Sequence, residues 1–232
     1  MYGRLSVAAP LRQKGCCVPR GAAAESRPYR GMKLIDESLR LELLQMRESD
    51  QAVREELAAD GSLFDGYHPR MEEVHRRNAA RLAEIIEQHG WPGGPPVAED
   101  GADAAWIIVQ HAIGEPEFQR RCLVLLKDAD AKDDIPLSQP AYLDDRIRTR
   151  EGNPQLYGTQ YDWDPSGEIN PLPIEDADRV DQRRRTVGLV PLAENTEGMR
   201  EAVRSEKEQP PRDFTLRRKE FDDWAHKPGW RQ

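Results

Sequence analysis

The sequence predicts a mainly α-helical domain of about six or seven helices with one small antiparallel β-hairpin. Three observations support this fold class. Apolar residues recur at intervals of three and four over most of the middle of the chain, which is the period of a helix buried on one face. Turns that contain proline and glycine separate these stretches. The period changes only near residues 155–174, where aromatic residues and threonine precede a D-P-S-G turn.

Composition limits how much of the chain can form a core. The chain has 232 residues, of which 38% are hydrophobic and 33% are charged. Its charged share is above that of a typical globular domain and its hydrophobic share is below it. We therefore expect one helical domain at residues 32–207. Residues 1–31 are expected to be a disordered leader or upstream sequence, so that Met1 and Met32 both stay possible starts. Residues 208–232 are expected to be a flexible charged tail.

The charge of the chain argues against two classes of partner. The formal net charge is −8, whereas nucleic acids and anionic membranes select clustered positive charge. No apolar run approaches the roughly 20 residues of a membrane-spanning helix. The three cysteines lack a metal-binding spacing, and no secretory signal pattern is present. We expect a cytoplasmic protein that binds neither nucleic acid nor membrane; the oligomeric state is left open.

The first helix is predicted over residues 37–59. Asp36 is a suitable N-cap for it, and Asp60 and Gly61 end it. Its apolar stripe consists of Leu39, Leu43, Met46, Val53 and Leu57.

The second helix, over residues 69–89, carries polar residues on its apolar face. Proline at the first helical position favours this start. The apolar face consists of Met71, Val74, Leu82, Ile85 and Ile86. A helical wheel places His75, Asn78 and His89 on the same face. Buried polar groups need hydrogen-bond partners, so these residues form either a network that fixes helix register or the lining of a cleft.

Five further helices follow from similar patterns. They are expected at about residues 100–113, 116–130, 139–151, 177–187 and 191–207. The helix over 100–113 is apolar nearly all round, which is typical of a central helix, and it carries Gln110 and His111. Ser138 is expected to cap the helix over 139–151.

The change of period predicts the hairpin. Residues 155–163 are expected to pair with residues 168–174 around a turn at 164–167. Pro171 and Pro173 cannot donate hydrogen bonds to the ladder, so the second strand should be irregular or at an edge.

The common catalytic motifs are absent. The chain has no G-x-x-x-x-G-K-[ST], G-x-G-x-x-G, H-E-x-x-H or G-x-S-x-G. The spacing of His68, Glu72 and His75 could suggest a metal site. Glu72, however, falls outside the apolar face, and Pro69 places His68 at the helix cap. We therefore expect no metal site and no cofactor.

Several short motifs occur in a fixed order between residues 34 and 195. They are G-W-P at 90–92, V-Q-H-A at 109–112, Y-L-D-D-R-I at 142–147 and P-Q-L-Y-G-T-Q at 154–160. With them the chain resembles a bacterial domain-of-unknown-function family, which often carries Asp at the position of His75. By this resemblance the recurring polar positions are Asn78, His111, Asp145, Arg146, Gln155, Tyr157, Thr159 and Gln160.

Two classes of function follow from these residues. The favoured one is a small-ligand-binding or interaction domain with a polar pocket, since no activated nucleophile is evident. A small polar ligand would then contact Asn78, Arg146, Gln155, Thr159 and Gln160. The site is expected where the helix of His111 meets a strand on which Gln155, Tyr157 and Thr159 share one face.

The alternative is an enzyme, a hydrolase or transferase. In this hypothesis His111 is the general base, Asp145 orients it, and Tyr157 or Gln160 donates a hydrogen bond to the substrate. The sequence does not identify the ligand or the substrate.

Overall fold

A computed structural model of the protein describes residues 36–232 with the exception of residues 65, 95, 131–134 and 207. The expected leader at residues 1–31, with Cys16 and Cys17, lies outside the described residues. The described part contains eight α-helices, two short 3-10 helices and one two-stranded antiparallel sheet. The prediction of a mainly helical fold with one small hairpin is therefore confirmed.

The predicted helices and the hairpin follow one another in the predicted order, and α8 follows them as a helix that was not predicted. The helices are α1 (Glu37–Ala59), α2 (Pro69–His89), α3 (Ala98–His111), α4 (Pro116–Asp130), α5 (Ser138–Arg150), α6 (Val180–Thr186), α7 (Leu192–Glu206) and α8 (Phe214–His226). The 3-10 helices span Ser62–Phe64 and Ala177–Arg179, and the strands are β1 (Tyr161–Trp163) and β2 (Ile169–Pro171). One cap differs from the prediction. Ser138 is the first residue of α5 and makes no capping hydrogen bond.

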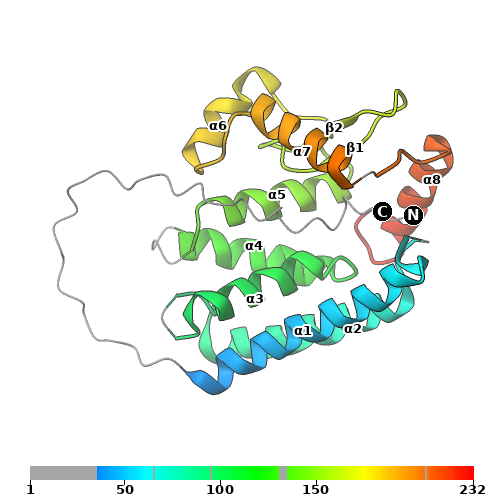
Figure 1. The fold of residues 1–232 in the computed structure, drawn as a ribbon. Helices are drawn as coiled ribbons and strands as arrows, with labels where there is room; N and C mark the ends of the chain where they lie inside the picture. Colours follow the sequence, from blue (N-terminus) through cyan, green and yellow to red (C-terminus); the bar gives the residue numbers. More distant parts are fainter. Residues whose placement is uncertain (1–35, 65, 95, 131–134, 207) are drawn as a thin grey trace.

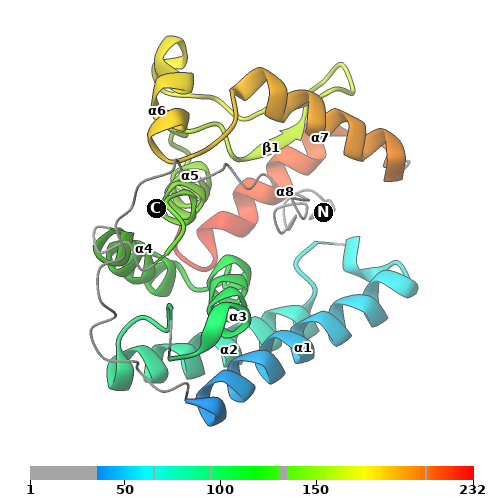
Figure 2. The same ribbon diagram turned by 60° about the vertical axis from the view of Figure 1, so that its left-hand side comes forward.

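The helices form layers from one end of the molecule to the other (Figure 1). Helices α1, α2 and α3 pack together at one end, α4 and α5 follow, and the hairpin with α6 and α7 forms the opposite end. Helix α8 passes between these two ends (Figure 2). Accordingly, Trp224 of α8 packs edge-on against Tyr67, while Arg217 of α8 forms an ion pair with Asp162 of β1. No helix in the described part of the chain is long and apolar enough to cross a membrane.

The main core is built by the apolar stripes of α1 to α5. Along α1, Leu39, Leu43, Met46 and Leu57 are buried and Val53 is half-buried. The predicted apolar residues of α2 are buried as well, together with His75 and Asn78. His89 is exposed, contrary to the prediction from the helical wheel. His89 is the last residue of α2, and the chain turns away at Gly90. The end of the apolar face of α2 is therefore not covered by neighbouring helices.

The hairpin is shorter than predicted. Strands β1 and β2 pair antiparallel, with Trp163 opposite Ile169, and the turn at residues 164–167 is the predicted one. Residues 155–160 do not form a strand, however. Their backbone contacts with the second segment are an isolated parallel bridge between Gln155 and Ile174 and a hydrogen bond from the N–H of Leu172 to the carbonyl of Gln160. The expected common face of Gln155, Tyr157 and Thr159 is therefore corrected: this segment is a loop.

The C-terminal segment corrects the expectation of a flexible charged tail. Asp213 caps α8 by accepting a hydrogen bond from the backbone N–H of Leu216. Ala225 and Trp230 are buried in the main core, where the Trp230 indole donates to the carbonyl of Ile113 over 2.8 Å. The aromatic residues scattered among the charges of this segment allow it to pack, because each adds a large apolar area.

Candidate functional site

A carboxylate and two imidazoles meet where α1, α2 and α3 pack together. They belong to Asp50, His75 and His111, and all three residues are buried. Asp50 is not among the residues that the sequence singles out. A signal was nevertheless present, because position 50 follows Met46 by four residues and precedes Val53 by three. It therefore interrupts the apolar stripe of α1 with a charge.

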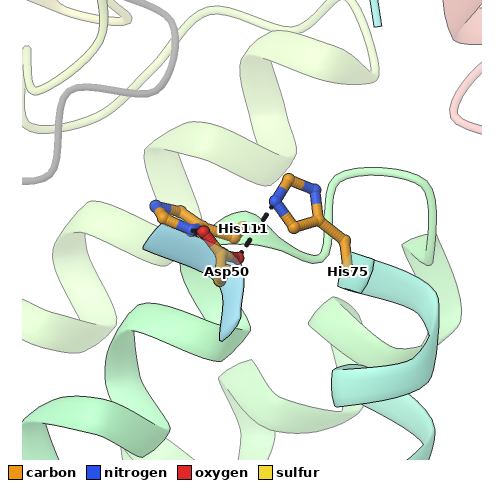
Figure 3. Close-up of side chains that lie close together, drawn as sticks. All are labelled: Asp50, His75 and His111. Carbon is orange, nitrogen blue, oxygen red and sulfur yellow. Dashed lines mark hydrogen bonds and ion pairs between the residues drawn. The ribbon is translucent and has the colours of Figure 1, made fainter. Parts of the chain in front are cut away.

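His111 and His75 both approach the carboxylate of Asp50 (Figure 3). Nδ1 of His111 lies 3.0 Å from each of the two carboxylate oxygens. Nε2 of His75 lies 3.1 Å from Oδ2. The centroids of the two imidazole rings are 5.4 Å apart. The three side chains thus form one compact cluster.

Tyr67 fixes the orientation of His75. Its hydroxyl is 2.8 Å from Nδ1 of the imidazole, and the two rings stack with their centroids 5.7 Å apart. The other ring nitrogen is less well placed. Although Nε2 of His75 is close to Asp50, it is not aligned with the carboxylate as a hydrogen bond and has no partner among the described residues.

Burial and the mutual contacts set the charge of this cluster. Burial raises the pKa of Asp50, but the contacts of His111 and His75 outweigh that effect and hold the pKa below its usual range. Burial lowers the pKa of His75, and the nearby carboxylate offsets this only in part. At neutral pH Asp50 is therefore ionised and His75 is neutral.

Asn78 is close in sequence to His75, and Gln110 is next to His111. Their side chains differ in their hydrogen bonds. The Asn78 side chain donates to the carbonyl of Met46 over 3.0 Å and so joins α2 to α1. The Gln110 side chain is buried, and neither atom of its amide has a hydrogen-bond partner in the described chain. Asn78 thus has a structural partner, whereas Gln110 leaves its bonding capacity unused.

Asp145 organises a second polar region, the loop at residues 155–160. Its buried carboxylate accepts hydrogen bonds from the backbone N–H groups of Leu156, Tyr157 and Thr159 and from the hydroxyl of Thr159. These contacts range from 2.6 to 3.1 Å. Burial raises the pKa of Asp145, and the N–H groups oppose part of that rise. The carboxylate takes up the donors that a strand would offer to its neighbour, which explains why this segment is a loop.

Two arginines of α6 bind the opposite side of the same loop. Nε of Arg183 donates to the carbonyl of Leu156 over 2.6 Å. Nη1 of Arg184 donates to the carbonyl of Tyr157, also over 2.6 Å. The loop is therefore held through its N–H groups by α5 and through its carbonyls by α6.

Gln155 and Gly158 complete the loop. The Gln155 amide closes it by donating to the carbonyl of Gln160 over 2.9 Å and accepting from its N–H over 2.8 Å. Gly158 has a φ of +67°, and a Cβ there would lie 2.6 Å from Cδ1 of Leu192 and 3.0 Å from Ile174. Close packing of apolar side chains, rather than a ligand, accounts for glycine at this position.

The structure separates residues that the enzyme hypothesis combined. The carboxylate beside His111 is Asp50, not Asp145, whose oxygens are bonded to the loop. Tyr157 belongs to that loop and contacts Asp145 through its backbone. The expected arrangement in which Asp145 orients His111 is therefore corrected. Residues 145 and 111 lie on different helices, and spacing along the chain does not indicate which carboxylate reaches the imidazole.

A cavity of about 630 Å³ lies between α5, the hairpin and α8. Two of the predicted ligand-binding residues, Arg146 and Gln160, line it; Asn78, Gln155 and Thr159 do not. Its basic lining residues are Arg146, Arg150, Arg217, Arg218, Lys219 and Arg231, and its acidic ones are Asp162 and Asp222. Its aromatic lining residues are Tyr161, Trp163, Phe214 and Phe221. The residues that α8 contributes to this lining were not predicted, because that segment was expected to be a flexible tail.

Arg146 is one of two buried arginines that line this cavity, the other being Arg150. Arg146 is 5% exposed, and its Nη1 donates to the carbonyl of Gln110 over 2.8 Å. Its Nε has no hydrogen-bond partner, and no carboxylate of the described residues forms an ion pair with it. Burial lowers its pKa to about 10, so the guanidinium stays charged at neutral pH. The two acidic lining residues, in contrast, already pair with Arg217 and Arg231.

Comparison with known proteins identifies one family. Residues 37–205 match the model of a family described as a family of unknown function (DUF6624). No curated protein and no solved structure matches the chain.

Proposed function

The chain belongs to DUF6624, a family of unknown function, and we propose from the geometry of its cavity that it binds a small anionic molecule. The ligand class is a carboxylate or phosphate ester that carries an aromatic or other apolar group. This proposal makes the expected ligand-binding domain more specific: the expected polar ligand becomes an anion, and α8 contributes to its pocket.

The observation that carries the proposal is the state of Arg146. A buried charge is costly unless another group compensates it, and this guanidinium has one carbonyl partner and no carboxylate. Because Arg146 lines the cavity, an anionic group there could supply the missing partner. A planar guanidinium is well suited to bind a carboxylate or phosphate through two parallel hydrogen bonds.

The rest of the lining supports the same ligand class. Six basic and two acidic residues line the cavity, although the whole chain has a net charge of −8. Positive charge is therefore concentrated at this place, which favours anions in the cavity. Aromatic residues from the hairpin and from α8 offer flat apolar surfaces to the uncharged part of a ligand.

Calorimetry and thermal melting of the full chain test this function with phenyl phosphate and benzoate, using benzyl alcohol as the uncharged probe. We expect the two anions to bind and raise the melting temperature, and the alcohol to do neither. Arg146→Gln should weaken the binding of the anions at least about 10-fold, because it removes a charge-assisted hydrogen bond.

The matched control is Arg121→Gln, which changes a half-exposed arginine that pairs with Glu87 on the surface. It should bind the anions like the wild type. If Arg146→Gln does not fold, Arg218→Gln, which also changes the lining, should weaken binding instead. Equal affinity for the anions and the alcohol, or equal anion affinity in all variants, would contradict the proposal.

A further inference from the structure

The cluster of Asp50, His75 and His111 does not line the cavity of the proposed function and raises a separate question. Its three side chains come from three helices, and each is a type that binds metal ions. One donor atom from each residue can be chosen so that all three lie within 4.8 Å of one another. The carboxylate oxygen Oδ2 is 3.1 Å from Nε2 of His75 and 3.0 Å from Nδ1 of His111.

These separations suit a small transition-metal ion. Donor atoms that bind tetrahedral Zn²⁺ at about 2.0–2.2 Å lie roughly 3.3–3.6 Å from one another. The two contacts of Asp50 are only slightly shorter than that, so small side-chain movements would open the cluster around an ion. Two imidazoles and one carboxylate also form a donor set of the kind used by Zn²⁺ and Fe²⁺, whereas Mg²⁺ and Ca²⁺ prefer oxygen alone.

The bonding of His75 favours an ion over a self-sufficient hydrogen-bond network. This residue is 4% exposed, and its Nε2 faces Asp50 without an aligned hydrogen bond. A network that served only stability would be expected to satisfy such a buried nitrogen. A metal ion between Nε2 and the carboxylate would provide the partner that Nε2 lacks.

Tyr67 holds His75 in the orientation that this role requires. Its hydroxyl contacts Nδ1 over 2.8 Å, which leaves Nε2 as the nitrogen that faces the carboxylate. Histidines that bind metals commonly use their second nitrogen in such a supporting hydrogen bond.

We propose that Asp50, His75 and His111 form a binding site for a divalent transition-metal ion of the zinc class. The residue spacing along the chain predicted no metal site, because the three residues lie on three different helices. Three protein ligands are also the number found in catalytic zinc sites, in which water occupies a fourth position. The site is independent of the proposed function, since Arg146 takes no part in it.

The test is titration of the full chain with Zn²⁺ after treatment with a chelator, followed by calorimetry and thermal melting. We expect one ion to bind per chain and the melting temperature to rise. Co²⁺ should bind in the same place, give the visible absorption of a tetrahedral ion, and be displaced by Zn²⁺. His75→Gln and His111→Gln should each weaken Zn²⁺ binding by more than 100-fold. Tyr67→Phe should weaken it about 10–100-fold, as is typical for a supporting hydrogen bond.

The matched controls are His68→Gln and His89→Gln, which change the two ends of α2 outside the cluster. Both should bind Zn²⁺ like the wild type, and so should Arg146→Gln, which separates this proposal from the proposed function. If a ligand variant does not fold, the Co²⁺ spectrum of Tyr67→Phe decides, and it should differ from that of the wild type. Absence of a stoichiometric ion would overturn the proposal. Unchanged affinity in both ligand variants, or loss of binding in His68→Gln, would do the same.

Discussion

At the scale of single residues, Asp50 determines how the buried histidines are arranged. It is 2% exposed, and a carboxylate at such a position is strongly destabilising unless nearby groups compensate its charge. His111 compensates it with a hydrogen bond shared between both oxygens, and His75 with a close contact. One charged residue in the stripe of α1 therefore fixes the neighbouring side chains of α2 and α3.

The lowered pKa of His75 leads to a prediction for the metal-free protein. The unfolded chain binds a proton at this residue as the pH falls below about 6.5, whereas the folded protein resists protonation there. His75 therefore lowers the free energy of unfolding as the pH falls from 6.5 toward its folded pKa, by at most about 1.4 kcal/mol per pH unit. Above pH 6.5 this penalty is absent.

We expect the wild type to lose more stability than His75→Gln between pH 7.5 and pH 5.5, by up to about 1 kcal/mol. Urea unfolding of both proteins at the two pH values, in the presence of a chelator, measures the difference. A wild type that gains stability relative to the variant at pH 5.5 would show instead that His75 is protonated in the fold.

At the scale of elements, the loop at residues 155–160 owes its shape to side chains from two helices. Asp145 of α5 binds its N–H groups, and Arg183 and Arg184 of α6 bind its carbonyls. The loop leads directly into β1, so its position also sets that of the hairpin at the cavity. The polar groups of this loop, which the sequence analysis assigned to a ligand site, are largely hydrogen-bonded within the protein.

Asp145→Asn tests this structural role. The substitution places an amide NH₂ group against backbone N–H donors, so at least one buried donor loses its acceptor. We expect the free energy of unfolding to fall by about 2–4 kcal/mol, since bonds to a buried charged group are each worth about 1.5–3 kcal/mol and do not add fully.

The control is the neighbouring Asp144→Asn, which affects a surface ion pair with Lys127 and should lower the free energy of unfolding by less than about 1 kcal/mol. Both values come from urea unfolding. Equal losses in the two variants would refute the assignment of Asp145 to the loop.

At the scale of the whole molecule, α8 and the residues after it join the two ends of the fold. Trp224 contacts Tyr67 near the histidine cluster, Arg217 contacts Asp162 of the hairpin, and Trp230 enters the main core. The cavity of the proposed function exists only because α8 closes one side of it. Stability and ligand binding are thus both expected to depend on the C-terminal segment.

Trp230→Ala measures how strongly this segment is attached. The indole is 3% exposed, donates to the carbonyl of Ile113, and lies near the guanidinium groups of Arg120 and Arg150. We expect its removal to lower the free energy of unfolding by about 3–5 kcal/mol.

Leu216→Ala, in the same helix but 51% exposed, should change the free energy of unfolding by no more than about 0.5 kcal/mol. Urea unfolding again gives both values. If Trp230→Ala lowers the free energy of unfolding only slightly, the C-terminal segment is a flexible tail and this prediction is wrong.

The sequence by itself determined helices α1 to α7, because helix formation and capping depend on neighbours three and four residues apart. Asp36 caps α1 as predicted, and the bounds of α1, α2 and α4 follow from their apolar stripes and prolines. The turn at residues 164–167 was predictable for the same reason, since its bonds join Asp164 to residues a few positions away.

Only the tertiary structure decided which distant side chains meet. Asp50 reaches His111 across 61 positions of the chain, and Asp145 reaches a loop that would otherwise be a strand. Trp230 reaches Ile113 across 117 positions, which turns an apparently flexible tail into part of the core. Such contacts depend on how the helices pack, and a local pattern of apolar and charged residues does not specify the partner of a buried polar group.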